Sequence, residues 1–333
     1  MSKKRRKLET GWRDTSKNEF LSQLEAFQPA QELLFPLGRA FGRYRKYLEP
    51  ASRHPAKMDS GLIGFLVKKY SRTGDVVLDP MAGSGSVGVV AAALGRDAFQ
   101  IELVRKFYGW MNEAADRLAA DYTIGNKGRI TNLCADARNT SKLVGQEIAD
   151  LIIFSPPYCD QNHYSDLSSR LGQLARSKTT GVGKQAAQGK FRFSYSRSKR
   201  NIGNLKGEKY LEEMRKVYAE SYKALKQEGL ATVAVRPLYR KKTVLDLPDL
   251  TWRLLKDANF EMVSVYKLML IRQSFWTRLY EKKHPEVPKI RHEYVLVVRR
   301  PREIEDIVHV CVSSRERARL LEWIASTTKG DIE

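Results

Sequence analysis

The chain of 333 residues has little cysteine, no long apolar run and far fewer acidic than basic residues. Its three cysteines are too few and too scattered for a disulfide framework or a zinc cluster, and its five histidines show no metal-ligand spacing. No apolar run approaches the ~20 residues that a membrane span needs, and the N-terminus lacks a signal-peptide core. We therefore expect a cytoplasmic protein that uses neither a membrane nor a metal.

A surplus of Lys and Arg gives the chain a strongly basic character. Only 38 Asp and Glu face 59 Lys and Arg, so the formal net charge is +21 and the isoelectric point lies near 9.8. A surplus of this size attracts polyanions, of which nucleic acid is the commonest. The apolar content of 42% is enough for a sizeable core. The composition therefore favours a globular protein whose partner is nucleic acid.

From residue 75 onward the pattern alternates between short apolar strands and amphipathic helices. The expected strands are 75–78, 98–103, 130–134, 151–154, 230–235, 262–271 and 294–298, and the expected helices are 86–94, 105–120, 210–226 and 250–258. This alternation predicts an α/β fold with helices on both faces of a seven-stranded, mostly parallel sheet. The last two strands have no predicted helix between them, so we expect an antiparallel edge strand. Around this domain, 51–312, we expect a basic, aromatic extension over 1–50 and a C-terminal helix within 313–333.

A glycine-rich turn follows the first strand, in the segment Asp-Pro-Met-Ala-Gly-Ser-Gly at 79–85. Glycines there allow the backbone to approach a nucleotide-like cofactor, although a Gly-x-Gly turn alone is weak evidence. Asp79 could accept a bond from an ammonium group, Glu102 from ribose hydroxyls and Asp136 from an adenine amino group. Each acid alone could be a solvated strand end. Three acids at successive strand ends favour a cofactor site at the carboxyl edge of the sheet.

A second loop, Ser155-Pro156-Pro157-Tyr158, follows the fourth strand. Ser155 and the carbonyl of Pro156 could accept the two hydrogens of an exocyclic amine, while the prolines hold that carbonyl in place. Tyr158 could stack on a base that has left its duplex. The alternative is a merely structural proline-rich turn. We expect Cys159, which has no visible base beside it, to be a packed thiol rather than a nucleophile.

The segment 159–209 interrupts the alternation. Between residues 170 and 209 it holds eleven Lys or Arg against one acid, with several glycines that keep it irregular. It could be a solvated surface loop or a substrate clamp with phosphate-binding cations and base-stacking aromatics, and we favour the clamp. The candidate substrate-binding residues are Phe191, Arg192, Phe193, Tyr195, Arg197, Lys199 and Arg200.

These motifs resemble those of the DNA N4-cytosine/N6-adenine amino-methyltransferase family. Residues 79–85 are similar to its cofactor motif, 155–158 to its catalytic motif, 54–57 to the segment that packs beside the cofactor, and 291–298 to its closing strand. The resemblance implies a Rossmann-like class I methyltransferase that uses S-adenosylmethionine. The expected catalytic residues are Ser155, Pro156, Pro157 and Tyr158. The expected cofactor-binding residues are His54, Pro55, Lys57, Asp79, Pro80, Met81, Ala82, Gly83, Ser84, Gly85, Glu102, Asp136 and Ala137.

The resemblance also bears on the substrate. A serine in first place of the catalytic motif implies the N4 amine of cytosine more often than the N6 amine of adenine. The likeness of the catalytic and closing motifs favours site-specific DNA, as in a restriction-modification pair. The charge, and the order in which the cofactor motif precedes the catalytic motif, favour RNA such as ribosomal RNA as the alternative. Adenine-N6 methylation and a non-catalytic nucleic-acid-binding protein remain less favoured possibilities.

Overall fold

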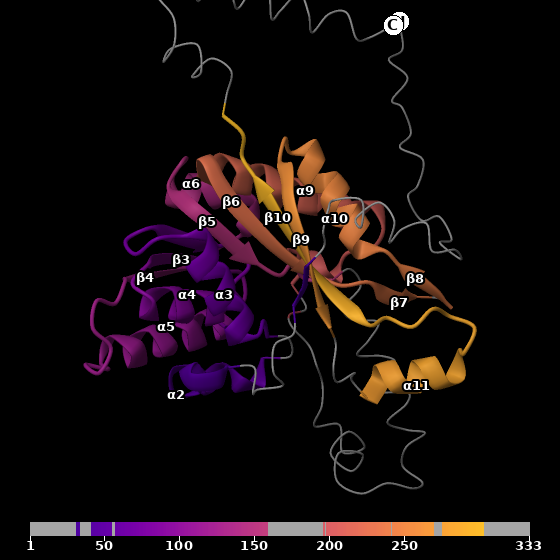
Figure 1. Cartoon of the computed structure of the whole chain (residues 1–333), viewed down its shortest axis with the longest axis horizontal. Coiled ribbons are helices and arrows are strands. Elements are labelled where there is room, and N and C mark those ends of the chain that lie inside the picture. Colours follow the sequence, from indigo (N-terminus) through magenta and orange to yellow (C-terminus); the bar gives the residue numbers. More distant parts are fainter. Residues whose placement is uncertain are drawn as a thin grey trace, which may run out of the picture.

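A computed structural model describes residues 31–33, 41–54, 57–158, 196, 198–240, 242–269 and 275–302. Its centre is an eight-stranded sheet in the order β1-β9-β10-β6-β5-β2-β3-β4 (Figure 1). The strands are β1 (Gln31–Leu33), β2 (Val76–Asp79), β3 (Asp97–Glu102), β4 (Ile130–Cys134), β5 (Ala149–Phe154), β6 (Leu225–Val235), β9 (Glu261–Met269) and β10 (His292–Arg299). All neighbouring strands run parallel except β10, which is antiparallel to both β6 and β9.

The central strands are buried on both faces, which explains their nearly continuous apolar sequences. Side chains of β5 alternate between two cores: Leu151 and Ile153 face one, while Ile152 and Phe154 face the other. All four are at most 1% exposed. At about 25 cal/mol per Å² of apolar surface, burial of this kind is the main stabilisation of the sheet.

Helices cover both faces of the sheet (Figure 1). The first core packs beneath α2 (Arg45–Leu48), α3 (Ser60–Tyr70), α4 (Ser86–Ala93) and α5 (Arg105–Ala119). The second packs beneath α6 (Thr140–Val144), α9 (Glu208–Ala224) and α10 (Leu247–Asp257). Side chains at helical spacing, such as Met214, Val217 and Tyr218 of α9, point into this core and are at most 1% exposed.

The fold class predicted from the sequence is confirmed, with additions. The short strand β1 extends the sheet beside β9, within the segment expected to be an extension. Phe41, Tyr44 and Tyr47 of that segment are buried in the first core, so the expected boundary at residue 50 cuts through packed structure. The expected C-terminal helix lies outside the described residues.

One expectation about the last strands is wrong. A helix, α11 (Phe275–Lys283), separates β9 from β10, and a hairpin of β7 (Leu238–Arg240) and β8 (Thr243–Leu245) follows β6. The antiparallel direction of β10 therefore does not come from a short hairpin connection. It comes from α11 and the loop after it, which bring the chain back so that β10 lies between β6 and β9.

The sheet changes winding direction between β2 and β5. From β2 the chain proceeds to β3 and β4 on one side, and then crosses back to β5 and β6 on the other. In open α/β sheets, the carboxyl ends of the strands at such a switch point form the ligand-binding crevice. This topology brings the loops after β2 and β5 together, since Leu78 and Ile152 are register partners in adjacent strands.

Candidate active site

The turn after β2 is so closely packed that only glycine fits at two of its positions. Gly83 and Gly85 have φ values of +52° and +75°, in the left-handed region that favours glycine. A Cβ on Gly83 would lie 3.0 Å from the ring of His54, and one on Gly85 would lie 2.8 Å from Cγ of Met111. His54 in turn packs edge-on against Phe107, with ring centroids 4.5 Å apart. His54, which the sequence predicts beside the cofactor, therefore lies against the glycine turn.

Asp79 closes β2 with a carboxyl group that is almost completely buried, as the residue is 3% exposed. Its Oδ1 accepts a 2.9 Å hydrogen bond from the backbone N–H of Met81. Burial raises the pKa of Asp79 to about 8, the bond from Met81 opposes this rise, and the nearby charge of Glu102 adds to it. Among the described residues no cation pairs with this carboxyl, so a cationic ligand would favour its charged form.

Glu102, at the end of β3, joins the turn to the neighbouring strand. Its Oε2 accepts from the backbone N–H of Gly83 at 2.8 Å, and its Oε1 accepts from that of Val104 at 2.7 Å. Burial raises the pKa of Glu102, although these backbone bonds favour the charged carboxylate and oppose the rise. The carboxylate is therefore fixed in orientation while keeping further lone pairs for hydroxyl donors.

Asp136, the third predicted acid, caps the 3-10 helix η3 (Ala137–Asn139) and is engaged by arginines. Its Oδ1 accepts from the backbone N–H and Nε of Arg138 at 3.1 and 2.8 Å, and its Oδ2 accepts from Nη2 of Arg138 at 2.6 Å. Arg200 approaches Oδ2 at 3.5 Å, and Arg138 also pairs with Glu213. Burial would raise the pKa of Asp136, but the bonds from Arg138 outweigh it and lower the pKa. Much of the acceptor capacity expected for an adenine amino group is thus already used.

The Ser-Pro-Pro-Tyr loop leaves β5 with Ser155 half-buried and Pro156 buried. The phenol of Tyr210, on α9, donates a 2.9 Å hydrogen bond to the carbonyl of Pro157. Two prolines and this bond restrict the loop backbone, as an amine-binding carbonyl would require. Tyr158 packs partly against the second core, and the Arg236 guanidinium lies 5.5 Å from its ring centroid.

Two polar residues at this end of the sheet were not predicted from the sequence to belong to the site. Arg236 directly follows β6. Glu293, the second residue of β10, lies opposite it because Tyr294 is the register partner of Val235. Burial raises the pKa of Glu293, and the positive charge of Arg236 partly opposes the rise. A polar Arg-Pro step after an apolar strand and the acid in Arg-His-Glu-Tyr were the available signals. Both residues lie beside the loop of Tyr158 rather than beside the glycine turn.

The remaining predicted residues divide into three groups. Ala82, Ser84 and Ala137 are buried in the turn or beside it, and Nζ of Lys57 donates to the carbonyl of His54 at 2.5 Å. Lys199 and Arg200 are exposed. The following predicted residues lie outside the described part: Pro55, Phe191, Arg192, Phe193, Tyr195 and Arg197.

Within the described ranges, no three His, Cys, Asp or Glu side chains gather as metal ligands would. No helix in those ranges combines the length and apolar character of a membrane span.

The residues present fit a cofactor that carries an amino acid and a nucleoside. The glycine turn directly follows Asp79, Asp79 offers a buried carboxyl to an ammonium group, and Glu102 holds a carboxylate at the next strand end. Ligand crevices of α/β sheets hold nucleotides in this way. Together, the strand order and these residues define a Rossmann-like α/β fold with a ligand crevice at the carboxyl ends of its strands, which agrees with the fold class that the sequence predicts.

Comparisons with known proteins agree with this class. Residues 2–113 match the family model described as DNA methylase, N6_N4_Mtase. The DNA adenine methyltransferase YhdJ of Escherichia coli (strain K12) is 38% identical over 63 residues, which cover 19% of this chain and 21% of that protein. The Type II methyltransferase M2.DpnII of Streptococcus pneumoniae is 34% identical over 71 residues, covering 21% and 25%. The family match over residues 2–113, about a third of the chain, and the two relatives confirm the resemblance to the DNA N4-cytosine/N6-adenine methyltransferase family.

The chain thus spans about a fifth to a quarter of the length of the curated relatives that it matches. Among solved structures, a SAM-dependent methyltransferase from Methanosarcina mazei is 12% identical with a TM-score of 0.43, covering 72% of this chain and 98% of that one. The protein TYW2 of M. jannaschii, solved with AdoMet, is also 12% identical, with a TM-score of 0.39 and coverage of 72% and 74%.

Proposed function

We propose that the protein transfers a methyl group from S-adenosylmethionine to an exocyclic amine of a base in DNA. The observation that carries this proposal is the adjacency of β2 and β5. It brings a glycine turn with buried carboxylates beside a rigid Ser-Pro-Pro-Tyr loop. The first loop suits a cationic amino acid and a ribose, whereas the second suits a planar amine.

In this proposal, S-adenosylmethionine supplies an electrophilic methyl group when it is bound. Asp79 holds the ammonium of its amino acid portion, and Glu102 accepts from its ribose hydroxyls. His54 packs against the glycine turn and maintains the shape of the crevice. Arg138 already donates three hydrogen bonds to the carboxylate of Asp136. Asp136 can therefore accept from the adenine portion only with the acceptor capacity that these bonds leave.

On the target side, an exocyclic amine is a poor nucleophile because its lone pair is delocalised into the ring. Ser155 and the carbonyl of Pro156 would accept the two amine hydrogens and favour tetrahedral nitrogen, so the lone pair would be directed at the methyl carbon. The nitrogen would gain its bond to the methyl carbon as the S–C bond of the cofactor breaks, and it would lose one proton through Ser155 to water. Because Tyr210 and two prolines fix the loop, little reorganisation accompanies the reaction. Tyr158 stacks on the base after it has left the duplex.

Within this chemistry we propose the N4 amine of cytosine as the target. Serine at position 155 supports this choice, as argued from the sequence. The N6 amine of adenine is the second candidate, because one relative is named a DNA adenine methyltransferase. RNA remains the alternative polymer because of the net charge of +21.

Mass spectrometry of nucleosides tests the target and the polymer together. Purified protein is incubated with S-adenosylmethionine and either duplex DNA of mixed sequence or ribosomal RNA, and each product is digested to nucleosides. We expect N4-methylcytosine from DNA. N6-methyladenine from DNA would replace the cytosine assignment by the adenine one. Methylation of RNA alone would contradict the DNA assignment, and no methylation of either would contradict the whole proposal.

A further inference from the structure

A small lobe lies next to the half of the crevice proposed to hold the target base. Its two segments come after β6 and after β9 in the chain. It consists of the β7–β8 hairpin, residues 238–245, and of α11 with the loop after it, residues 275–291. In Figure 1 the hairpin and α11 extend away from the sheet, on the side opposite α3, α4 and α5. Arg236 comes just before the lobe in the chain, and Glu293 comes just after it. The chain therefore enters and leaves the lobe beside Tyr158.

The lobe is held together by an aromatic and polar network. The rings of Tyr239 and Tyr280 stack with centroids 4.7 Å apart and an angle of 19° between their planes. The phenol of Tyr239 donates to Glu281 at 2.6 Å and accepts from the backbone N–H of Ile290 at 2.8 Å. The phenol of Tyr280 accepts from the backbone N–H of Lys242 at 2.9 Å. The hairpin and α11 therefore form one preorganised unit rather than two separate loops.

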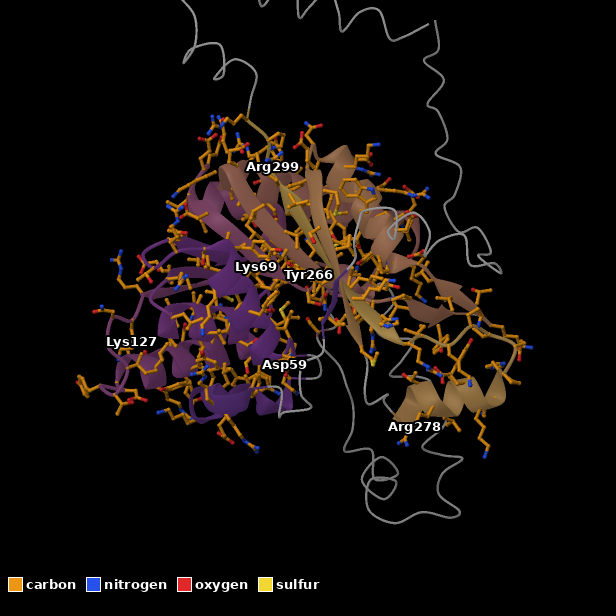
Figure 2. All side chains as sticks on the ribbon, viewed as in Figure 1. Asp59, Lys69, Lys127, Tyr266, Arg278 and Arg299 are labelled. Carbon is orange, nitrogen blue, oxygen red and sulfur yellow. The ribbon has the colours of Figure 1, made fainter. Side chains whose placement is uncertain are left out.

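The two acids of the lobe contact other residues of the lobe. Glu281, with a side chain only 10% exposed, accepts from Tyr239 and from Arg291 at 3.1 Å. Glu286 lies 3.4 Å from Nδ1 of His284. The exposed cationic side chains outnumber these two acids, and Figure 2 shows one of them, Arg278, on the outside of α11. They are Lys242, Arg278, Lys282, Lys283, Lys289 and Arg291.

We propose that this lobe is a docking surface for the phosphate backbone of duplex DNA beside the target base. The argument is charge complementarity on a rigid support: exposed cations, only two acids of which Glu281 is paired inside the lobe, and a position next to the Tyr158 loop. Phosphate contacts set the position of a protein on a duplex without reading its sequence. The lobe would thus hold the duplex while the target base enters the crevice, an assignment that rests on the proposed DNA methylation.

The test compares two quadruple variants of the full chain. The lobe variant combines K242Q, R278Q, K282Q and K283Q. The control variant combines K68Q, R72Q, K142Q and K256Q, four cations that are also exposed but lie on or after helices of the sheet body, outside the lobe. Both variants lose the same charge, so a difference between them reports position and not net charge.

Binding of a fluorescent DNA duplex is followed by anisotropy over a series of salt concentrations. Each phosphate contact contributes about 0.9 to the magnitude of the slope of log K against log salt. We therefore expect the slope of the lobe variant to be smaller in magnitude by about 2 to 4, and its affinity for the duplex to be at least about tenfold lower. The control variant should keep a slope nearer that of the parent, and both should bind S-adenosylmethionine like the parent.

The outcomes separate this inference from the proposed function. If the parent methylates DNA and both variants lose slope equally, the lobe is not the docking surface although the activity stands. If the lobe variant loses binding to RNA but not to DNA, the DNA-docking inference is overturned. If the parent binds cofactor but neither binds nor methylates DNA, the proposed function itself fails.

Discussion

The two halves of the crevice are built in different ways. The half formed by β2, β3 and β4 consists of tight turns, buried acids and backbone N–H groups, as in the pairing of Glu102 with Gly83. The half formed by β5, β6 and β10 carries prolines, aromatic rings and arginine, as in the approach of Arg236 to Tyr158. The first half suits a small cationic cofactor of fixed shape. The second suits a planar base attached to a large anionic polymer.

This difference in chemistry implies a difference in mutational effects. Changes in the first half should act on cofactor affinity or on the stability of the sheet. Changes in the second half should act on turnover while the cofactor still binds. The four predictions below test that separation.

The largest effect is expected for Ser155→Ala, in the second half. Removing one preorganised acceptor for the target amine should reduce kcat by about 10² to 10³, while the cofactor affinity stays near that of the parent. Single-turnover methylation of DNA measures the first quantity and calorimetric titration with S-adenosylmethionine the second. Parent-like turnover in this variant would refute the role of the loop. Ser264→Ala, a half-buried serine within β9 and away from both loops, is the matched control.

Asp79→Asn tests the first half. Loss of a charged partner for the ammonium should weaken cofactor binding by roughly 10- to 100-fold, the equivalent of about 1.5 to 3 kcal/mol. In the parent, cofactor affinity should rise as the pH increases toward about 8, because the carboxyl must lose its proton to bind a cation. Titrations across this pH range should show a weaker rise in the variant. An equal rise in both proteins would mean that another group titrates.

The same carboxyl affects stability in the cofactor-free protein. Its folded-state pKa of about 8 exceeds the ordinary value of 3.8, so between these values the folded state holds a proton that the unfolded state releases. Its contribution to stability therefore falls as the pH rises from about 4 to about 8. The variant lacks this term, so its Tm measured across that range should decline less than that of the parent.

Gly88→Ala tests how the first half is supported. Oε1 of Gln100 accepts from the backbone N–H of Gly88 at 3.0 Å, and its Nε2 donates to Asn132 at 2.9 Å. A Cβ on Gly88 would lie 2.3 Å from the Gln100 amide, which is buried and cannot swing aside without losing these bonds. We expect a loss of about 2 to 3 kcal/mol in the free energy of unfolding, measured with urea.

The control for this change is Gly109→Ala. Gly109 lies on the exposed side of α5, and a Cβ added to it would meet no atom within 4 Å. Because alanine favours helix more than glycine does, this variant should gain about 0.5 to 1 kcal/mol. Equal losses in both variants would show that the Gln100 amide does not restrict position 88.

The smallest effect is expected for Tyr210→Phe, which removes the hydrogen bond to the carbonyl of Pro157. At about 1 kcal/mol for such a bond, turnover should fall by about threefold to tenfold as the catalytic loop loosens. Tyr218→Phe is the control, because its phenol bonds to Thr251 on α10, away from the loop. A loss of turnover in the Tyr218 variant equal to that in the Tyr210 variant would indicate general destabilisation.

The sequence predicts the first half of the crevice well because its chemistry is local. Asp79, Gly83 and Gly85 fall within a single turn, and Glu102 closes the very next strand. The alternation of strands and helices is equally local, which is why the sheet and most of its helices could be predicted. Local patterns of this kind are visible without knowing which strands are neighbours.

The second half could be predicted only in part. Arg236 and Glu293 are 57 positions apart in the chain and meet because β6 and β10 pair in an antiparallel register. The engagement of Asp136 by Arg138 and Arg200 also depends on tertiary contacts. The α11 helix was missed because its polar and aromatic residues pack on a small lobe and not on the main core. Trp276, Leu279 and Tyr280 do recur at helical spacing, but over a segment of only nine residues, which is too short to be predicted with ease.

The most direct test of the account is a single-turnover experiment with a radiolabelled methyl group. Protein preloaded with methyl-labelled S-adenosylmethionine is mixed with excess duplex DNA, and the label in DNA is followed for the parent and for Ser155→Ala. The account predicts that the parent transfers the label in one turnover, whereas the variant retains the cofactor with the label untransferred. Transfer by the variant at the rate of the parent would contradict the claim that these two loops form one active site.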